Sequence, residues 1–239
     1  MMQDDGDMDH SREDAYDPFA MPSVIPVFPL TGAILLPGNT LPLNIFEPRY
    51  LAMVRDALTG TKLIGMIQPR EQTGGTTPCL YDIGGVGRIE ECSETPDGRF
   101  LIALKGISRF RIIEELSATT PYRQVNADWS AFTEDQIEPP ARDGVARDRL
   151  LAHLKAYLDQ KGLEADFDAI AQSPDAVLVN TLSMILPVAS AEKQALLEAG
   201  SLADRGEMLS ALLTMETFGS ALGEGVTSDS DEDGPAPVN

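Results

Sequence analysis

The sequence predicts an α+β fold: a small barrel or strongly curved sheet of about six strands, with one helix packed on it, followed by an all-helical bundle. Two observations support this prediction. Residues 24–132 hold short β-rich runs separated by prolines and glycines, which is typical of small barrels. From about residue 141, apolar residues instead recur every three or four positions, as they do on amphipathic helices.

The clearest strand signal is a hairpin with strands at 89–94 and 99–105 around a Thr-Pro-Asp-Gly turn at 95–98. Proline presets φ in such a turn, and glycine supplies a positive φ. Three residues of the second strand share one face at a period of two and should be buried: Phe100, Ile102 and Leu104. Further short strands are expected at 24–28, 41–45, 63–67, 107–116 and 122–129.

One helix is predicted within the strand region, from Pro48 at its first position to Gly60 after its last turn. Its apolar stripe consists of Tyr50, Met53, Val54, Ala57 and Leu58. Four or five short amphipathic helices should follow residue 141. Three of them have expected capping hydroxyls: Ser173 before Pro174, Ser190 at the start of a short helix that ends at Gly200, and Ser201 before Asp204.

The net charge of −20 divides the chain into a folded body and two tails. Residues 1–20 carry a net −6 and residues 221–239 a net −5, which leaves −9 for the body. We expect five segments: an acidic disordered tail at 1–22, the barrel at 23–133, a linker at 134–143, the helical bundle at 144–220 and a second acidic disordered tail at 221–239.

Charge and composition disfavour several classes of protein. A nucleic-acid partner needs a surplus of Lys and Arg on one face, and the body is acidic even without its tails. The first residues lack a basic and an apolar signal region, and no apolar run is long enough to cross a membrane. We therefore expect a cytoplasmic location, no membrane partner and no nucleic acid.

The sequence offers little catalytic chemistry. Its two histidines, His10 and His153, have no recognisable partner, and Cys79 and Cys92 lack CxxC spacing. The glycines at 84–87 do not form a dinucleotide-binding motif and are better explained as bends in a strand. We predict no catalytic residues, no cofactor and no metal site. A pair formed by one cysteine and His153 is left as an alternative.

Several sequence blocks carry a resemblance to a known family. They are, in order, Ile25-Pro26-Val27-Phe28-Pro29-Leu30, Leu36-Pro37-Gly38, Ile45-Phe46-Glu47-Pro48-Arg49-Tyr50, Gly84-Gly85-Val86-Gly87-Arg88-Ile89, Gly106-Ile107-Ser108-Arg109-Phe110-Arg111 and Glu192-Lys193-Gln194. Together they resemble the N-terminal substrate-binding domain of Lon proteases over about residues 23–218. The IFEPRY and GxxRF blocks in this order make the resemblance specific.

The resemblance implies a PUA-like β-barrel packed on a helix bundle. It also implies a stand-alone, non-catalytic module for protein or peptide binding, an adaptor or regulator in protein quality control, because the sequence has no Walker motif and no positions for the Ser–Lys peptidase of full-length Lon. Expected partners are unfolded or degron-bearing protein segments, or a partner protein such as a protease. RNA binding is the alternative, since PUA-like barrels elsewhere bind RNA.

Five residues of the family blocks are candidates for protein or peptide contact: Phe46, Arg49, Tyr50, Arg109 and Phe110. Each also has a structural interpretation. Phe46 and Tyr50 could anchor the helix on the sheet, and Arg49 and Arg109 could pair with carboxylates of the fold.

Overall fold

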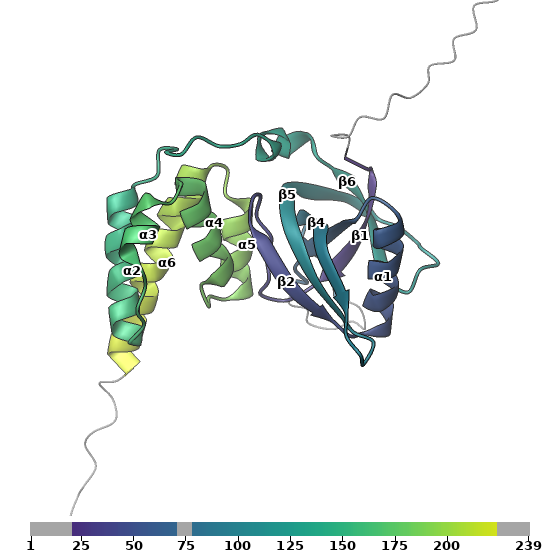
Figure 1. Cartoon of the computed structure of the whole chain (residues 1–239). Helices are drawn as coiled ribbons and strands as arrows, with labels where there is room; N and C mark the ends of the chain where they lie inside the picture. The colour runs from purple at the N-terminus through teal and green to yellow at the C-terminus, as the bar shows by residue number, and fades with distance from the viewer. Residues whose placement is uncertain (1–20, 71–77, 224–239) are drawn as a thin grey trace, which may run out of the picture.

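The computed structural model describes residues 21–70 and 78–223, and it shows a mixed α+β fold with a six-stranded sheet and several helices (Figure 1). The sheet region contains β1 (Val24–Pro29), β2 (Thr40–Ile45), α1 (Pro48–Thr59), β3 (Leu63–Ile67), β4 (Ile83–Glu94), β5 (Phe100–Glu115) and β6 (Arg123–Asp128). The short helix η1 (Ser130–Gln136) leads to α2 (Arg147–Lys161), α3 (Phe167–Gln172), α4 (Asp175–Ile185), α5 (Ser190–Glu198) and α6 (Leu202–Gly223).

The six strands pair in the order β2-β5-β4-β3-β1-β6, and β5 also pairs with β6. The pairing of β1 with β3 is parallel and the other pairings are antiparallel. The long strand β5 thus has β4 along one edge, and β2 and β6 along different parts of the other. The sheet curves around a core to which α1 contributes one side (Figure 1).

The predicted hairpin is confirmed. β4 ends at Glu94 and β5 begins at Phe100, and the turn between them has Gly98 at φ 80°. The backbone N–H of Gly98 donates to the carbonyl of Thr95 over 2.9 Å. The three residues expected on one face are buried: Phe100, Ile102 and Leu104.

The glycines of β4 mark a bend, as expected, and also a close approach of backbone. The β4–β5 register shifts between Val86 and Gly87, which is the bulge. The loop before β2 also crosses the strand here, so that a Cβ on Gly85 would lie 1.9 Å from the carbonyl oxygen of Leu35. The second constraint depends on a contact between segments 50 residues apart, which strand pattern alone does not reveal.

Helix α1 begins and is followed where the sequence predicts, at Pro48 and Gly60. Four residues of its stripe are buried: Tyr50, Met53, Val54 and Ala57. They join Phe28, Ile64, Met66 and Phe100 in one apolar cluster, so α1 packs into the hollow of the sheet. The apolar surface that these side chains remove from water is the main contribution to the stability of the contact between helix and sheet.

The second core lies among α2, α4, α5 and α6 and reaches the sheet through Ile34, Leu36 and Ile83. Ser201 receives the backbone N–H of Asp204, which agrees with the predicted cap. Ser173 does not cap α4, whose N-cap residue is Pro174, and its hydroxyl donates to the carbonyl of Ile170 at the end of α3. Ser190 does not cap α5 either, because it is the first residue of that helix and Ala189 is the N-cap. The described part of the chain contains no helix long and apolar enough to cross a membrane.

The two expected acidic tails fall almost entirely outside the described residues. Residues 1–20 and 224–239 are not described, whereas α6 continues to Gly223. At the expected linker, η1 covers residues 130–136, and the carboxylate of Asp135 is held by Arg109. The chain from 137 to 146 then reaches α2 without regular secondary structure.

Candidate protein-binding surface

Strand β2 lies at an edge of the sheet, since among the described strands it pairs only with β5. The carbonyl of Asn39 accepts the N–H of Gly106 over 2.8 Å, and backbone bonds alternate along an antiparallel pair. The backbone groups that face the free edge are therefore those of Thr40, Pro42 and Asn44. All three residues are exposed. Proline is tolerated at this position because an edge strand loses no ladder bond there.

Phe46 follows β2 directly, and its side chain is 62% exposed. Its neighbour Ile45 points into the core, so alternation along the strand turns Phe46 outward. The next residue, Glu47, is the N-cap of α1, and its carbonyl receives the N–H groups of Tyr50 and Leu51 over 2.9 Å. The start of the helix thus fixes Phe46 as a large apolar side chain in solvent.

Arg49 lies on the first turn of α1 and is exposed. Its Nε and Nη2 lie 2.9 and 2.8 Å from Oε2 of Glu47, and its guanidinium stacks 4.5 Å from the centre of the Tyr50 ring. The expected arginine–carboxylate contact is therefore present. The side chain still exposes 52% of its surface beside Phe46.

Tyr50 is buried and supports this corner from below. Its ring centre lies 4.2 Å from that of Phe28 on β1, and burial raises the pKa of its hydroxyl. Tyr50 is therefore an anchor of α1 rather than a contact residue. Leu101 is a second exposed apolar side chain, at 46%, and its partner across β2 and β5 is Asn44, two residues before Phe46. Its outward position follows from the alternation of the hairpin strand, a signal that the sequence already contained.

The prediction that Arg109 and Phe110 contact a peptide is not supported, because both side chains are buried. Arg109 binds the carboxylate of Asp135 at two points of 2.9 Å each. Its Nη1 donates to the carbonyls of Leu197 and Ala199 over 3.2 and 2.8 Å. Phe110 is fully buried and packs 5.8 Å from the ring of Trp129. Arg109 joins the sheet to η1 and the end of α5, whereas Phe110 packs inside the core of the sheet. Neither side chain lies on the surface with the exposed Phe46 and Arg49.

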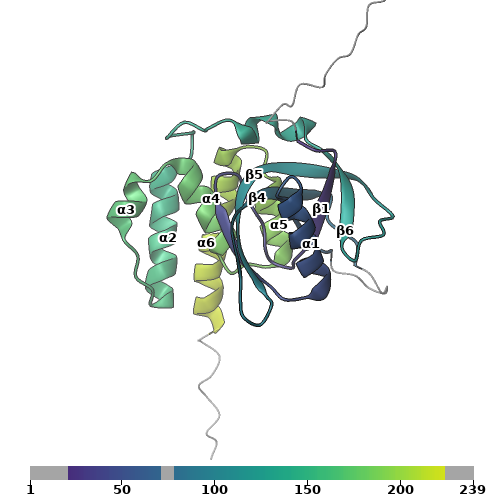
Figure 2. The same ribbon diagram turned by 45° about the vertical axis from the view of Figure 1, so that its right-hand side comes forward.

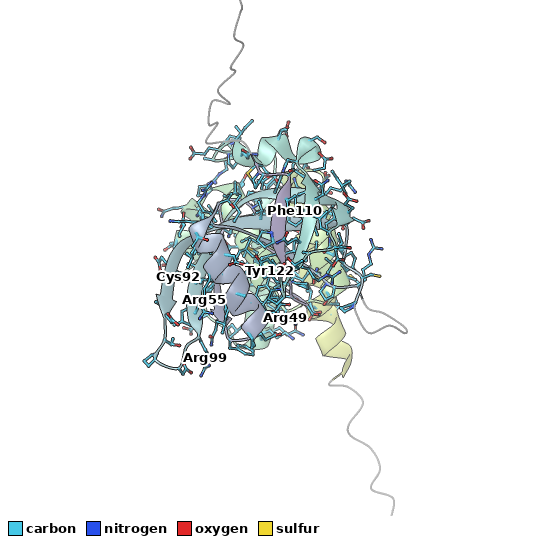
Figure 3. All side chains as sticks on the ribbon, turned by 90° about the vertical axis from the view of Figure 1, so that its right-hand side faces the viewer. Arg49, Arg55, Cys92, Arg99, Phe110 and Tyr122 are labelled. Atoms are coloured by element: carbon cyan, nitrogen blue, oxygen red, sulfur yellow. The ribbon has the colours of Figure 1, made fainter. Side chains whose placement is uncertain are left out.

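Other arginines on the same side of the molecule as Arg49 are also paired (Figure 3). Arg55 of α1 lies 3.8 Å from Glu94, and Arg99 at the hairpin pairs with Asp97. The hydrogen bonds of Thr95 and Arg99 lower the pKa of Asp97, so this pair stays ionised at neutral pH. This side is therefore mixed in charge rather than basic.

The candidate catalytic pair finds no support in the local chemistry. Cys92 lies on β4, and most of its side chain is exposed. The part of its surroundings that excludes water, followed by the carboxylate of Glu94, raises the pKa of the thiol. A raised pKa disfavours the reactive thiolate. His153 lies on α2 in the helical part, and its buried Nδ1 has no hydrogen-bond partner among the residues that the structure describes. Within residues 21–70 and 78–223, no group of three His, Cys, Asp or Glu side chains could hold a metal ion.

Comparison with known proteins first defines the kind of fold and then the family. Two solved structures share the fold: a Lon N-terminal domain protein of Xanthomonas campestris (24% identity, TM-score 0.55) and the N-terminal domain of a Mycobacterium avium complex Lon protease (16%, 0.56). Each match covers 80% of this chain and 98% of the other. The family model of the substrate-binding domain of ATP-dependent protease La (LON) matches residues 24–215. The chain belongs to this family.

Curated relatives are much longer than this chain. The Lon protease of Dictyoglomus thermophilum is 28% identical over 210 residues, and that of Parabacteroides distasonis is 29% identical over 199 residues. These matches cover 82% and 80% of this chain but only 25% and 24% of the relatives. The chain thus spans about a quarter of their length, and the match lies in the substrate-binding domain.

Proposed function

We propose that this chain is a non-catalytic protein- and peptide-binding module that takes up extended apolar segments at the β2 edge, with Phe46 as the main anchor. The observation that carries the proposal is the exposed Phe46 at the end of an open edge strand in a member of a substrate-binding family. An added strand would receive backbone hydrogen bonds from β2, and its side chains would contact Phe46 and Leu101.

In this proposal the protein works as an adaptor or regulator in protein quality control in the cytoplasm. Its partners are unfolded or degron-bearing segments, and a separate protease is a candidate partner. The fold is a PUA-like barrel with a helical bundle, an interpretation supported by the pairing of β5 with both β4 and β6. RNA binding, the other use of such barrels, is disfavoured by the net −9 of residues 21–220 and by the paired arginines near Phe46.

The test is fluorescence anisotropy with labelled, carboxymethylated α-lactalbumin, which stays unfolded. Phe46→Ser should raise Kd about tenfold or more, since a buried Phe side chain contributes about 1.5–3 kcal/mol. Ile113→Ser is the matched control. Ile113 is 61% exposed and lies near the C-terminal end of β5, whereas β2 pairs with the N-terminal part of that strand. Its Kd should stay within about twofold of wild type.

Equal binding by wild type and Phe46→Ser, or no binding by wild type, would contradict the proposal. A second arm uses a labelled polyuridine RNA at rising salt. RNA binding whose affinity falls steeply as the salt concentration rises would favour the RNA alternative.

A further inference from the structure

Helix α6 has apolar side chains on its solvent side as well as on its core side. Leu209 and Leu213 are fully buried in the helical core. On the opposite side Met208, Met215 and Phe218 expose 36%, 66% and 67% of their surface. A surface helix normally presents polar residues there, so this side of α6 is an apolar stripe without a partner in the described residues.

The stripe has the spacing of a helix–helix seam. Met208 and Met215 are seven residues apart, as are Ala211 and Phe218, and the two pairs interleave three and four residues apart. This is the a and d pattern by which one helix packs against another. From Met208 to Phe218 the stripe is about 15 Å long, or three helical turns. Figure 2 shows this C-terminal half of α6 (yellow) running down the bundle beside α2.

One end of the stripe is acidic. Met208 shares a shallow depression between α5 and α6 with three carboxylates, those of Glu198, Asp204 and Glu207. Asp204 lies one turn before Met208 on the same side of α6. Arg149 of α2 pairs with Glu207 over 3.2 Å, which leaves this end with a net negative charge.

The charge of the surface indicates which occupant fits. The chain's own segment 224–239 carries five acids and no Lys or Arg, so like charges would meet at Asp204 and Glu207. A second copy meets the same obstacle. Parallel pairing of two α6 helices sets Glu207 of one copy against Glu207 of the other. Antiparallel pairing sets the acidic end against the part of the second copy that follows Met208, and the sequence after Met208 contains no Lys or Arg.

We propose that the solvent side of α6 is a docking surface for a basic, amphipathic helix of another protein. The partner helix has apolar residues at a and d positions, which pack on Met208, Met215 and Phe218. Its Lys or Arg side chains at one end meet Glu198, Asp204 and Glu207. This surface lies on the helical part of the chain and differs from the β2 edge proposed to bind extended segments.

The test uses the full chain and two labelled 21-residue peptides in fluorescence anisotropy. Both peptides have Leu at a and d positions, and one has Lys and the other Glu at e and g. The Lys peptide should bind wild type at least tenfold more tightly than the Glu peptide, and Met215→Ser/Phe218→Ser should weaken it about tenfold or more. Glu207→Lys should weaken it severalfold, and Ile113→Ser, an exposed residue of β5, should leave it unchanged. The replaced side chains are exposed, so circular dichroism should show an unchanged fold.

The proposal would be overturned if both peptides bound equally well, or if wild type and the double variant bound the Lys peptide equally well. Binding would then depend neither on the charge of the peptide nor on the stripe. No binding by a wild-type chain that light scattering shows to be dimeric would assign the stripe to a second copy. No binding by a monomeric wild type would mean that the stripe does not take a basic amphipathic helix. Both of these outcomes also overturn the proposal, whereas a loss of α-lactalbumin binding alone would concern only the β2 edge.

Discussion

Arg109 of β5 and Asp135 of η1 form a two-point ion pair in which Nε–Oδ2 and Nη2–Oδ1 are both 2.9 Å, and each side chain is only 10% exposed. The free Nη1 of Arg109 reaches the end of α5, where it donates to the carbonyls of Leu197 and Ala199. One side chain therefore joins the sheet, the connecting segment and the helical bundle. Arg205 of α6 completes the arrangement by donating its Nε to the carbonyl of Leu196 over 2.8 Å.

We expect Arg109→Ala to destabilise the whole chain by about 3–5 kcal/mol, because it removes the cation that pairs with the buried Asp135 carboxylate and the donor to two helix-end carbonyls. Asp135 then keeps only the backbone N–H of residue 109, at 2.8 Å. The measurement is urea unfolding followed by the fluorescence of Trp129, the single tryptophan, which lies one residue before η1. The double variant Arg109→Ala/Asp135→Ala should be less destabilised than the sum of the two single variants.

Arg99→Ala is the control for this experiment, since Arg99 also pairs with an aspartate, Asp97, but in an exposed turn. Its urea midpoint should stay near that of wild type. A similar small shift for Arg109→Ala would mean that the buried pair does not hold the two parts of the molecule together.

The local elements could be predicted from the sequence because their causes are local. The turn at 95–98 with Gly98 at positive φ fixes the hairpin, and Pro48 fixes the first turn of α1. The order of the strands could not be predicted, because β1 pairs with β3 and β6 across long stretches of chain. The Ser173 hydroxyl could bond either to the start of α4 or to the end of α3, and in the structure it donates to the carbonyl of Ile170 at the end of α3.

The candidate site was predictable only in part, for a related reason. Phe46 and Arg49 are exposed because strand alternation and the helix start turn them outward, which are local effects. Arg109 is buried because η1 and the end of α5 cover it, and Phe110 is buried because it points into the core of the sheet with Ile25 and Val86. Asp135, the partner of Arg109, is one acid among many in the sequence, and nothing in its neighbourhood marks it.

Gly85→Ala tests the crossing of the loop over β4. The new Cβ would lie 1.9 Å from the Leu35 carbonyl oxygen, so the loop or the strand must move. We expect a loss of stability of several kcal/mol, measured as a lower urea midpoint. Gly200→Ala is the control, because its nearest neighbour, an oxygen of Asp204, would be at an ordinary 3.5 Å. Equal midpoints for the two variants would contradict the observed crossing.

Tyr122 makes stability depend on pH in the alkaline range. Burial, followed by the hydrogen bond to Asp56 over 2.7 Å, raises the pKa of its hydroxyl to about 12. The unfolded chain therefore loses this proton first, so the free energy of unfolding should fall as pH rises from about 10 to 12. Tyr122→Phe should lose this part of the decline in urea unfolding at pH 9 and 11. An unchanged slope in the variant would assign the decline to other groups.

The contribution of Lys193 to stability depends on pH in the opposite direction. Its side chain is 3% exposed, and Nζ donates to the carbonyls of Ser183 and Met184 at the end of α4. Burial lowers its pKa to about 8 from the ordinary 10.5. Between these two pH values the unfolded chain binds more protons than the folded one, so the contribution of Lys193 to stability rises with pH.

We expect the free energy of unfolding of wild type, relative to Lys193→Met, to increase by about 1–2 kcal/mol between pH 7.5 and 9.5. Taking the difference between the two proteins cancels groups that titrate in both, such as the tyrosines. The measurement is urea unfolding at four pH values across this range. Lys155→Met, on the exposed side of α2, serves as the control and should give a difference that does not change with pH. If Lys193→Met also gave a constant difference, the folded chain would hold this lysine at its ordinary pKa, and its two carbonyl contacts would then offset the whole cost of burying the charge.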